Sequence, residues 1–359
     1  MAHGPQPVTV GAALAAGAGF DTLIDARSPA EFAEDHLPGA VNWPVLDDDE
    51  RRIVGTLYVQ TSPLAARKLG AALVSRRIAG ILETQVHDKP KEWRPLVYCW
   101  RGGQRSGSLA LVLAQIGFRT AQLQGGYKAF RARVRDDLLT LPASLHYRVL
   151  CGRTGSGKTR LLQALARAGA QVLDLEGLAH HRGSVLGAMP GLPQPSQKQF
   201  DNRIWQALRG FSAERPVFVE SESARIGTLR VPQALLDAMH QRADCVRVET
   251  PLPVRTAMLL ADYRDATLAP EPLCKLLDGL VELRGRERVG QWQALARAGQ
   301  WQDLIGALIS DHYDPLYERS MRRSYAGLEQ APQVVIDADD DTALAAATAQ
   351  LLAQPSGRT

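Results

Sequence analysis

A cysteine in a turn rich in glycine and arginine is the first feature of the sequence that could do chemistry. The turn, Cys99-Trp-Arg-Gly-Gly-Gln-Arg-Ser106, follows an apolar run that predicts a buried strand and precedes a helical pattern. Its two glycines let the backbone curl with its N–H groups inward, which creates an anion-binding concavity at the positive end of the next helix. Arg101 and Arg105 add fixed positive charge. We therefore expect Cys99 to be a thiolate at neutral pH and a nucleophile, with a packed structural thiol as the alternative.

A phosphate-binding loop is the second such feature. The segment 152–159 reads GRTGSGKT and matches G-x-x-x-x-G-K-[ST], between a predicted strand and a predicted helix. The backbone N–H groups of such a loop can cradle two phosphates, and its lysine adds a point charge. A dinucleotide site is disfavoured because the third glycine of G-x-G-x-x-G is absent. The residues predicted to bind phosphate are Gly152, Gly155, Ser156, Gly157, Lys158 and Thr159, of which Thr159 could also hold Mg²⁺.

Two acidic residues follow later strands and could act beside this loop. Glu220 comes directly after Val217-Phe218-Val219 and is the better candidate, and Asp174 ends the short segment Gln171-Val-Leu-Asp174. Either could equally be an ordinary carboxylate at a strand end. Because no clean apolar run ends in aspartate, we do not expect efficient nucleotide hydrolysis, and the sequence predicts no dedicated metal site.

The elements that must position these loops form two α/β domains. Short apolar runs, typical of buried parallel strands, alternate with helical patterns in both halves of the chain. We predict one domain over residues 1–143, with an insertion at about 45–94, and a second over 144–359, with Leu141–Ser144 as the linker. The predicted strands are 22–24, 96–98 and 121–123 in the first domain and 147–151, 171–175, 217–219, 245–248 and 333–336 in the second.

Length and composition agree with a folded protein of two domains. Of the 359 residues, 45% are hydrophobic and 22% are charged, which excludes disorder as the dominant state. The net charge of +4 allows a polyanionic partner without requiring one. Charges interrupt every long apolar stretch, the N-terminus lacks a secretory pattern, and the 4 scattered cysteines form neither a disulfide framework nor a zinc motif. We expect a cytoplasmic protein without a membrane segment, and the oligomeric state is left open.

The spacing Cys-x5-Arg occurs both in tyrosine phosphatases and in rhodanese-type sulfurtransferases, and the flanking sequence separates them. Residues 25–32 and 36–42 closely resemble the rhodanese signature, and residues 123–127 resemble the C-terminal strand and turn of a rhodanese. Phosphatases usually carry histidine before the cysteine, where this chain has Tyr98. In rhodaneses the cysteine carries a transferable chalcogen as a persulfide. We expect three residues of this signature mainly to cap strand ends and to form ion pairs, namely Asp25, Arg27 and His36.

Further segments extend the resemblance over nearly the whole chain. A rhodanese module joined to a P-loop module is rare, and this chain resembles the bacterial tRNA 2-selenouridine synthase family. One position departs from the family pattern, because Asp201 stands where glutamate is expected. The matching segments outside the two loops are 42–44, 54–58, 62–70, 174–184, 197–201 and 220–223.

The resemblance implies a function and its partners. In this family, selenium from selenophosphate replaces sulfur at C2 of the wobble uridine of tRNA, and geranyl diphosphate can first alkylate the thiouridine. By resemblance, Cys99 would carry selenium as S-selanylcysteine, and the P-loop could hold the prenyl diphosphate. The basic clusters that could contact tRNA phosphates are 131/133/135, 180–182, 284/286/288 and 319/322/323.

Two other functions stay open at this point. The first is an ATP-dependent sulfurtransferase or kinase without specificity for tRNA. The second is a non-catalytic module that binds tRNA through an inert rhodanese fold. Inert rhodaneses usually lack the cysteine, so the presence of Cys99 argues against the second function.

Overall fold

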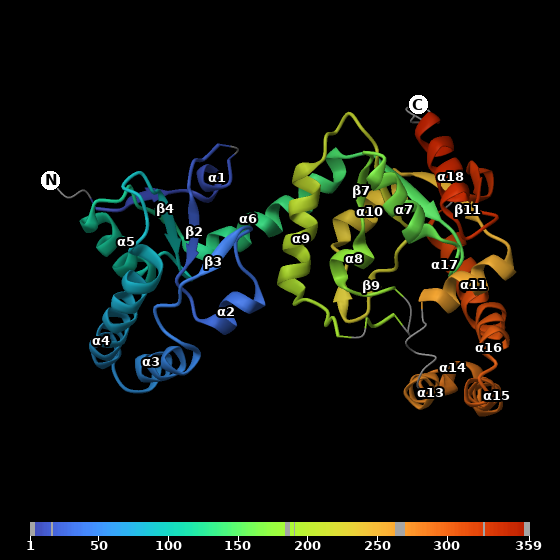
Figure 1. Cartoon of the computed structure of the whole chain (residues 1–359), viewed down its shortest axis with the longest axis horizontal. Coiled ribbons are helices and arrows are strands. Elements are labelled where there is room, and N and C mark those ends of the chain that lie inside the picture. Colours follow the sequence, from blue (N-terminus) through green and yellow to red (C-terminus); the bar gives the residue numbers. More distant parts are fainter. Residues whose placement is uncertain are drawn as a thin grey trace. The chain divides into compact units, whose positions relative to one another are not determined.

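A computed structural model describes residues 4–15, 17–183, 187–189, 191–262, 270–325 and 327–354, apart from the side chain of Arg322. Ser184, which ends the 174–184 segment, and Arg322, a candidate for tRNA contact, therefore lie outside what is described. The chain divides into two compact units (Figure 1). Unit 1 comprises Met1–Asp137 with Pro195–Asn202, and unit 2 comprises Leu138–Gln194 with Arg203–Thr359.

A parallel sheet of five strands forms the centre of unit 1, in the order β1-β5-β4-β2-β3. The central strands are the buried apolar runs that the sequence predicts. The two edge strands, β1 and β3, are short and partly exposed, so they carry little of the apolar signal on which the prediction depends. The strands are β1 Gln6–Val8, β2 Thr22–Asp25, β3 Ala40–Asn42, β4 Pro95–Tyr98 and β5 Ala121–Leu123.

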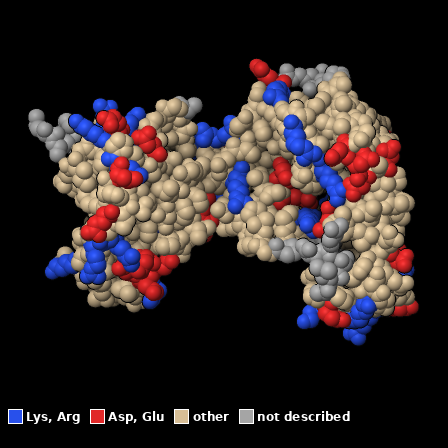
Figure 2. All heavy atoms as spheres, viewed as in Figure 1, with Lys and Arg blue, Asp and Glu red and all other residues tan. Residues whose placement is uncertain are grey.

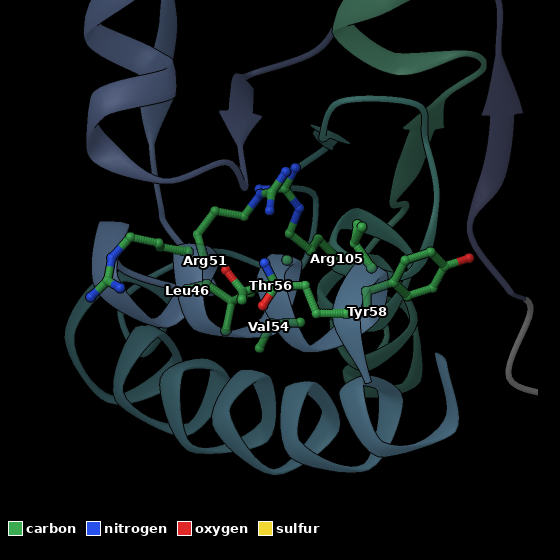
Figure 3. A pocket seen from close by; sticks show the side chains of 10 residues that line it. Leu46, Arg51, Val54, Thr56, Tyr58 and Arg105 are labelled. Carbon is green, nitrogen blue, oxygen red and sulfur yellow. The ribbon is translucent and has the colours of Figure 1, made fainter. Parts of the chain in front are cut away.

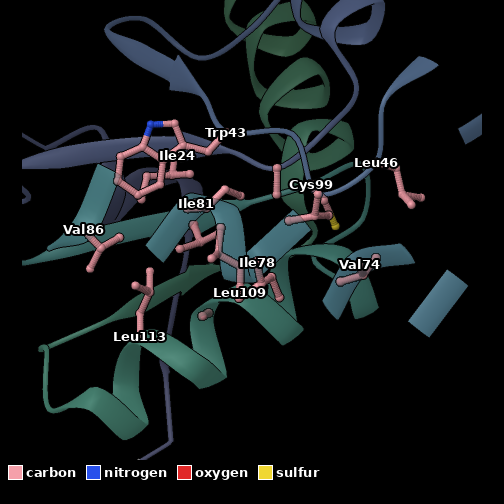
Figure 4. Packing of buried hydrophobic residues seen from close by; sticks show 14 of the residues in the cluster. Ile24, Trp43, Leu46, Val74, Ile78, Ile81, Val86, Cys99, Leu109 and Leu113 are labelled. Carbon is pink, nitrogen blue, oxygen red and sulfur yellow. The ribbon is translucent and has the colours of Figure 1, made fainter. Parts of the chain in front are cut away.

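Helices cover this sheet, and two of them come from the predicted insertion. Residues 45–94 contain α3 and α4, which pack against each other. Val74 and Ile78 of α4 lie in one apolar cluster with Ile24 of β2 and Leu109 of α5, so the insertion belongs to the core of unit 1 (Figure 4). The helices are α1 Val10–Ala13, α2 Pro29–Glu34, α3 Asp48–Gln60, α4 Pro63–Ile81 with a π-turn at Leu82–Val86, α5 Gln104–Ile116 and α6 Gly126–Thr140.

A second parallel sheet of five strands forms the centre of unit 2, in the order β12-β11-β6-β8-β7. A 3-10 turn at Leu141–Ser144, the predicted linker, leads into the central strand β6. The predicted strands of this half are all present. They are β6 Tyr147–Cys151, β7 Gln171–Leu173, β8 Val217–Glu220, β11 Asp244–Glu249 and β12 Gln333–Val335, and a separate antiparallel pair is β9 Arg225–Ile226 with β10 Leu229–Arg230.

The helices of unit 2 include a small bundle with an apolar core of its own. Helices α13 to α16 enclose Trp292, Leu277 and Leu304, all nearly inaccessible to solvent. None of the helices that the structure describes is long and apolar enough to cross a bilayer. The helices are α7 Lys158–Arg167, α8 Leu175–Ala179, α9 Gln197–Gly210 (which begins in unit 1), α10 Gln233–Gln241, α11 Leu252–Asp262, α13 Pro270–Asp278, α14 Val281–Arg284, α15 Arg286–Arg297, α16 Trp301–Leu308, α17 Asp314–Ser324 and α18 Asp341–Ala353.

Candidate active sites

Cys99 lies in the turn between β4 and α5, at the carboxyl end of a central parallel strand, where α/β sheets usually place their sites. The residue is only 3% exposed and belongs to the apolar cluster, near Leu46 and Val74 (Figure 4). The residue also lines a cavity of about 870 Å³. The hydroxyl of Ser106 donates a hydrogen bond to the Cys99 sulfur at 3.1 Å. The sequence alone did not single out Ser106, although it lies in the first turn of the helix after the cysteine.

The turn is held open for an anion by backbone geometry. Gly102 has φ +69°, and a Cβ there would lie 2.7 Å from the Leu123 carbonyl oxygen, so this position requires glycine. Gln122 donates to the Gly102 carbonyl at 2.8 Å, so this carbonyl oxygen already has a partner. Within the described part of the chain, the backbone N–H groups of residues 100–105 donate to no acceptor. They are therefore available to an anionic ligand.

The two arginines of the turn have different surroundings. Arg105 donates to Glu31 at 2.6 Å, and Arg51 of α3 approaches the same carboxylate at 3.8 Å. Figure 3 shows the guanidinium groups of Arg51 and Arg105 facing one another beside a neighbouring cavity. Burial opposes ionisation of Glu31, but the hydrogen bond and charge of Arg105 outweigh it and lower the Glu31 pKa. Arg101 is exposed in the Cys99 cavity, and among the described residues it has no ion pair.

Asp25 and Arg27 form a buried ion pair that supports the fold. The guanidinium lies 2.6 Å from the carboxylate, and the two side chains are 0% and 1% exposed. Arg27 also donates to the Asp35 carbonyl at 2.6 Å and lies 3.9 Å from the ring centre of Tyr127. His36 contacts the Phe32 carbonyl at 2.9 Å. The pairing of Asp25 with Arg27 is the kind of contact that the sequence led us to expect.

In unit 2, the phosphate loop connects β6 to α7. Gly155 and Gly157 have φ +76° and +77°, and Lys158 donates to the Gly152 carbonyl at 2.7 Å. The buried Arg255 of α11 connects the loop to α17. It donates to the Thr154 carbonyl at 2.7 Å and to Asp314 at 2.6 Å. Asp314 is the first residue of α17, so Arg255 connects this helix to the loop.

Three glutamates gather beside Lys158 and Thr159. Single carboxylate oxygens of Glu176, Glu220 and Glu222 lie within 4.8 Å of one another, and the Thr159 hydroxyl donates to Glu176 at 3.3 Å. Burial, then the charge of Glu220, raises the pKa of Glu176 to about 9 and that of Glu222 to about 8. Burial raises the pKa of Glu220 to about 7 although Lys158 lowers it. The arrangement suits a hard cation or a shared proton.

The sequence found part of this cluster. It singled out Glu220 but not its neighbours, although Glu222 is two residues away and Glu176 lies in the 174–184 segment. Asp174, the other predicted acid, lines the same cavity and caps α8 by accepting from the Gly177 N–H at 2.7 Å.

One cavity of about 660 Å³ contains the phosphate loop, the glutamates and Asp174. Figure 2 shows acidic side chains inside a hollow of unit 2 with basic side chains beside it. The basic residues that line the cavity are Lys158, Arg160 and Arg182. The cavity thus contains both cationic groups for phosphates and carboxylates for a cation.

Comparison with known proteins places both loops in recognised domains. The model of the rhodanese-like domain matches residues 11–133, and that of the tRNA 2-selenouridine synthase AAA domain matches residues 145–272. A tRNA 2-selenouridine synthase of Alcanivorax borkumensis is 34% identical over 333 residues, which cover 84% of this chain and 90% of that protein. One of Marinobacter nauticus is 32% identical over 346 residues, which cover 88% and 93%.

The chain belongs to the tRNA 2-selenouridine synthase family. The predicted fold class is also confirmed, since a rhodanese-like domain with a parallel sheet precedes a P-loop α/β domain. The family resemblance that the sequence motifs indicated is therefore correct.

Several of the basic residues suggested for RNA contact are engaged within the protein. Arg131 pairs with Asp201 at 3.0 Å, and Arg133 pairs with Asp137 at 2.7 Å. Arg284 donates to the buried His312 at 3.0 Å. Spacing along the sequence identifies positive charges but not the acids that fold against them.

Proposed function

We propose that this protein is a tRNA 2-selenouridine synthase that acts in two steps, each served by one of the two loops. The observation that carries the proposal is the presence, in one chain of this family, of a cysteine under open backbone N–H groups and a complete phosphate loop. The substrates would be a thiolated tRNA, geranyl diphosphate and selenophosphate.

The first step is S-alkylation of the 2-thiouridine, with the phosphate loop holding the diphosphate. The thiocarbonyl sulfur attacks C1 of the geranyl group, an S–C bond forms and the C1–O bond breaks. The N3–H proton of the uridine leaves, and diphosphate departs. Lys158 and the loop N–H groups stabilise the charge that develops on the departing diphosphate.

The second step replaces the alkylated sulfur by selenium. The anionic selenium of selenophosphate attacks C2, a C2–Se bond forms, and the C2–S bond breaks as geranylthiolate departs. Water then cleaves the Se–P bond and releases phosphate. The S-alkyl group departs as a thiolate, which is a better leaving group than thiocarbonyl sulfur. The turn would hold this anionic selenium donor through Cys99, its N–H groups, Ser106 and Arg101. The exposed face of Trp100, which lines the same cavity, is suited to stack a splayed base.

A divalent cation such as Mg²⁺ fits the unit 2 cavity. Carboxylate and hydroxyl oxygens are the ligands that hard cations prefer, and Thr159, Glu176, Glu220 and Glu222 supply them. Bound there, the cation would neutralise phosphate charge. The raised pKa of these glutamates means that cation binding would compete with protons.

Mass spectrometry of the wobble nucleoside tests the proposal. The protein is incubated with thiolated tRNA, geranyl diphosphate and selenophosphate, and the wild type should yield geranylated and selenated uridine. Cys99→Ser should abolish selenium incorporation yet permit geranylation, and Lys158→Ala should stop geranylation. If folded Cys99→Ser also lost geranylation, the division between the loops would be wrong. ATP turnover without any change in the tRNA would favour a nucleotide-dependent sulfurtransferase or kinase instead.

A further inference from the structure

One side of the phosphate-loop cavity is apolar and touches the loop itself. Met258 and Leu259 of α11 line this cavity. A Cβ at Gly155 would lie 2.8 Å from Leu259 Cδ1, and a Cβ at Gly157 would lie 3.3 Å from the Met258 sulfur. Two side chains without hydrogen-bond donors thus pack directly on the backbone that would hold phosphates.

Helix α17 continues this apolar side. Leu316, Tyr317 and Met321 of α17 line the same cavity. The Tyr317 ring centre lies 5.8 Å from the Lys158 ammonium, so the apolar side begins next to the phosphate-binding charge. Leu316 lines the cavity and is 37% exposed, so part of its hydrocarbon surface is open to solvent.

We propose that this apolar wall, formed by Met258, Leu259, Leu316, Tyr317 and Met321, binds the hydrocarbon chain of the prenyl diphosphate. The inference rests on the proposed geranylation and adds the location of the prenyl tail. The diphosphate would lie in the loop by charge complementarity with Lys158, and the tail would cover the wall.

The chemistry of the wall favours a hydrocarbon over a nucleotide base. Its members are two thioethers, two leucines and one phenol ring, and methionine adapts its shape to flexible apolar ligands. The cavity volume of about 660 Å³ is in the range of small-molecule sites. A base and ribose would instead call for several polar groups that fix orientation.

Binding measurements on the full chain test the wall separately from the reaction. The probes are inorganic diphosphate, and the unreactive thiolodiphosphate analogues of dimethylallyl and geranyl diphosphate. For the wild type, affinity should rise with chain length. Leu316→Asn should weaken geranyl analogue binding by about 10-fold, because burial of a leucine side chain is lost, and should leave inorganic diphosphate binding unchanged. Leu352→Asn on α18, where the leucine is 46% exposed outside the cavity, is the matched control and should change neither.

The outcomes separate the wall from the proposed function. If Leu316→Asn binds the geranyl analogue as tightly as the wild type does, the wall is not the prenyl site, even when geranylation itself is observed. If Leu316→Asn weakened the binding of ATP alone, the inference would also be wrong, and the wall would instead be a pocket for a nucleotide base. Failure of the wild type to bind any prenyl analogue, or to geranylate thiolated tRNA, would overturn the proposed function as well.

Discussion

The glutamates beside Lys158 should make the stability of the protein fall as the pH rises. Burial raises the pKa of Glu176, Glu220 and Glu222 to about 9, 7 and 8, against an ordinary value of 4.5. Between pH 4.5 and 9 the folded protein therefore binds more protons at this cluster than the unfolded chain does. Stability from these groups is fully present below pH 4.5 and is lost as the pH passes through the raised values.

The size of the effect follows from the number of protons that the folded protein binds in excess of the unfolded chain. Each one contributes a slope of about 1.4 kcal/mol per pH unit to the free energy of unfolding. Glu222→Gln removes one titrating group and one neighbouring charge from the cluster. Between pH 6 and 8 we expect the variant to have a slope shallower by roughly 1 kcal/mol per pH unit. Glu282→Gln, at an exposed position on α14, is the control and should leave the slope as in the wild type.

Urea denaturation at several pH values measures this slope. The wild type, Glu222→Gln and Glu282→Gln are unfolded at pH 6, 7, 8 and 9, with and without Mg²⁺. Mg²⁺ should stabilise the wild type more at pH 9 than at pH 6, because the ion competes with protons for the carboxylates. Equal slopes for the wild type and Glu222→Gln would refute the reasoning, since they would mean that these groups ionise alike in the folded and unfolded chains.

Two further variants test the architecture of unit 1 by thermal denaturation. Gly102→Ala should lower the free energy of unfolding by roughly 1–3 kcal/mol, because φ is +69° and a Cβ would press on the Leu123 carbonyl. Gly103→Ala, where a Cβ meets nothing within 4 Å, should cost much less, and equal losses would contradict the clash. Arg27→Met should cost about 3–5 kcal/mol because it leaves the buried Asp25 carboxylate unpaired. Adding Asp25→Asn should recover part of that loss. If the losses of unfolding free energy of the two single variants simply added up in the double variant, the result would argue against the pairing.

Local sequence was enough to predict the two loops and the central strands. The phosphate loop and the cysteine turn are continuous segments. Their glycines occur where the backbone must turn tightly, so the spacing of residues alone is enough to recognise both loops. The central strands β4 and β6 are buried along their whole length, and their residues are apolar apart from Arg148. The edge strand β1 and the packing of α4 into the core had no such local signal, because exposed strands and helix contacts depend on distant partners.

Only the tertiary structure decided which charges meet. The sequence by itself determined the fold class, the cysteine turn and the phosphate loop, since each depends on residues that are neighbours in the chain. It could not show that Glu176 and Glu222 join Glu220, that Glu31 faces Arg105, or that Arg255 contacts the phosphate loop. Those contacts join residues from different elements, and electrostatic interactions depend on separation in space and on burial, which arise only when the chain folds.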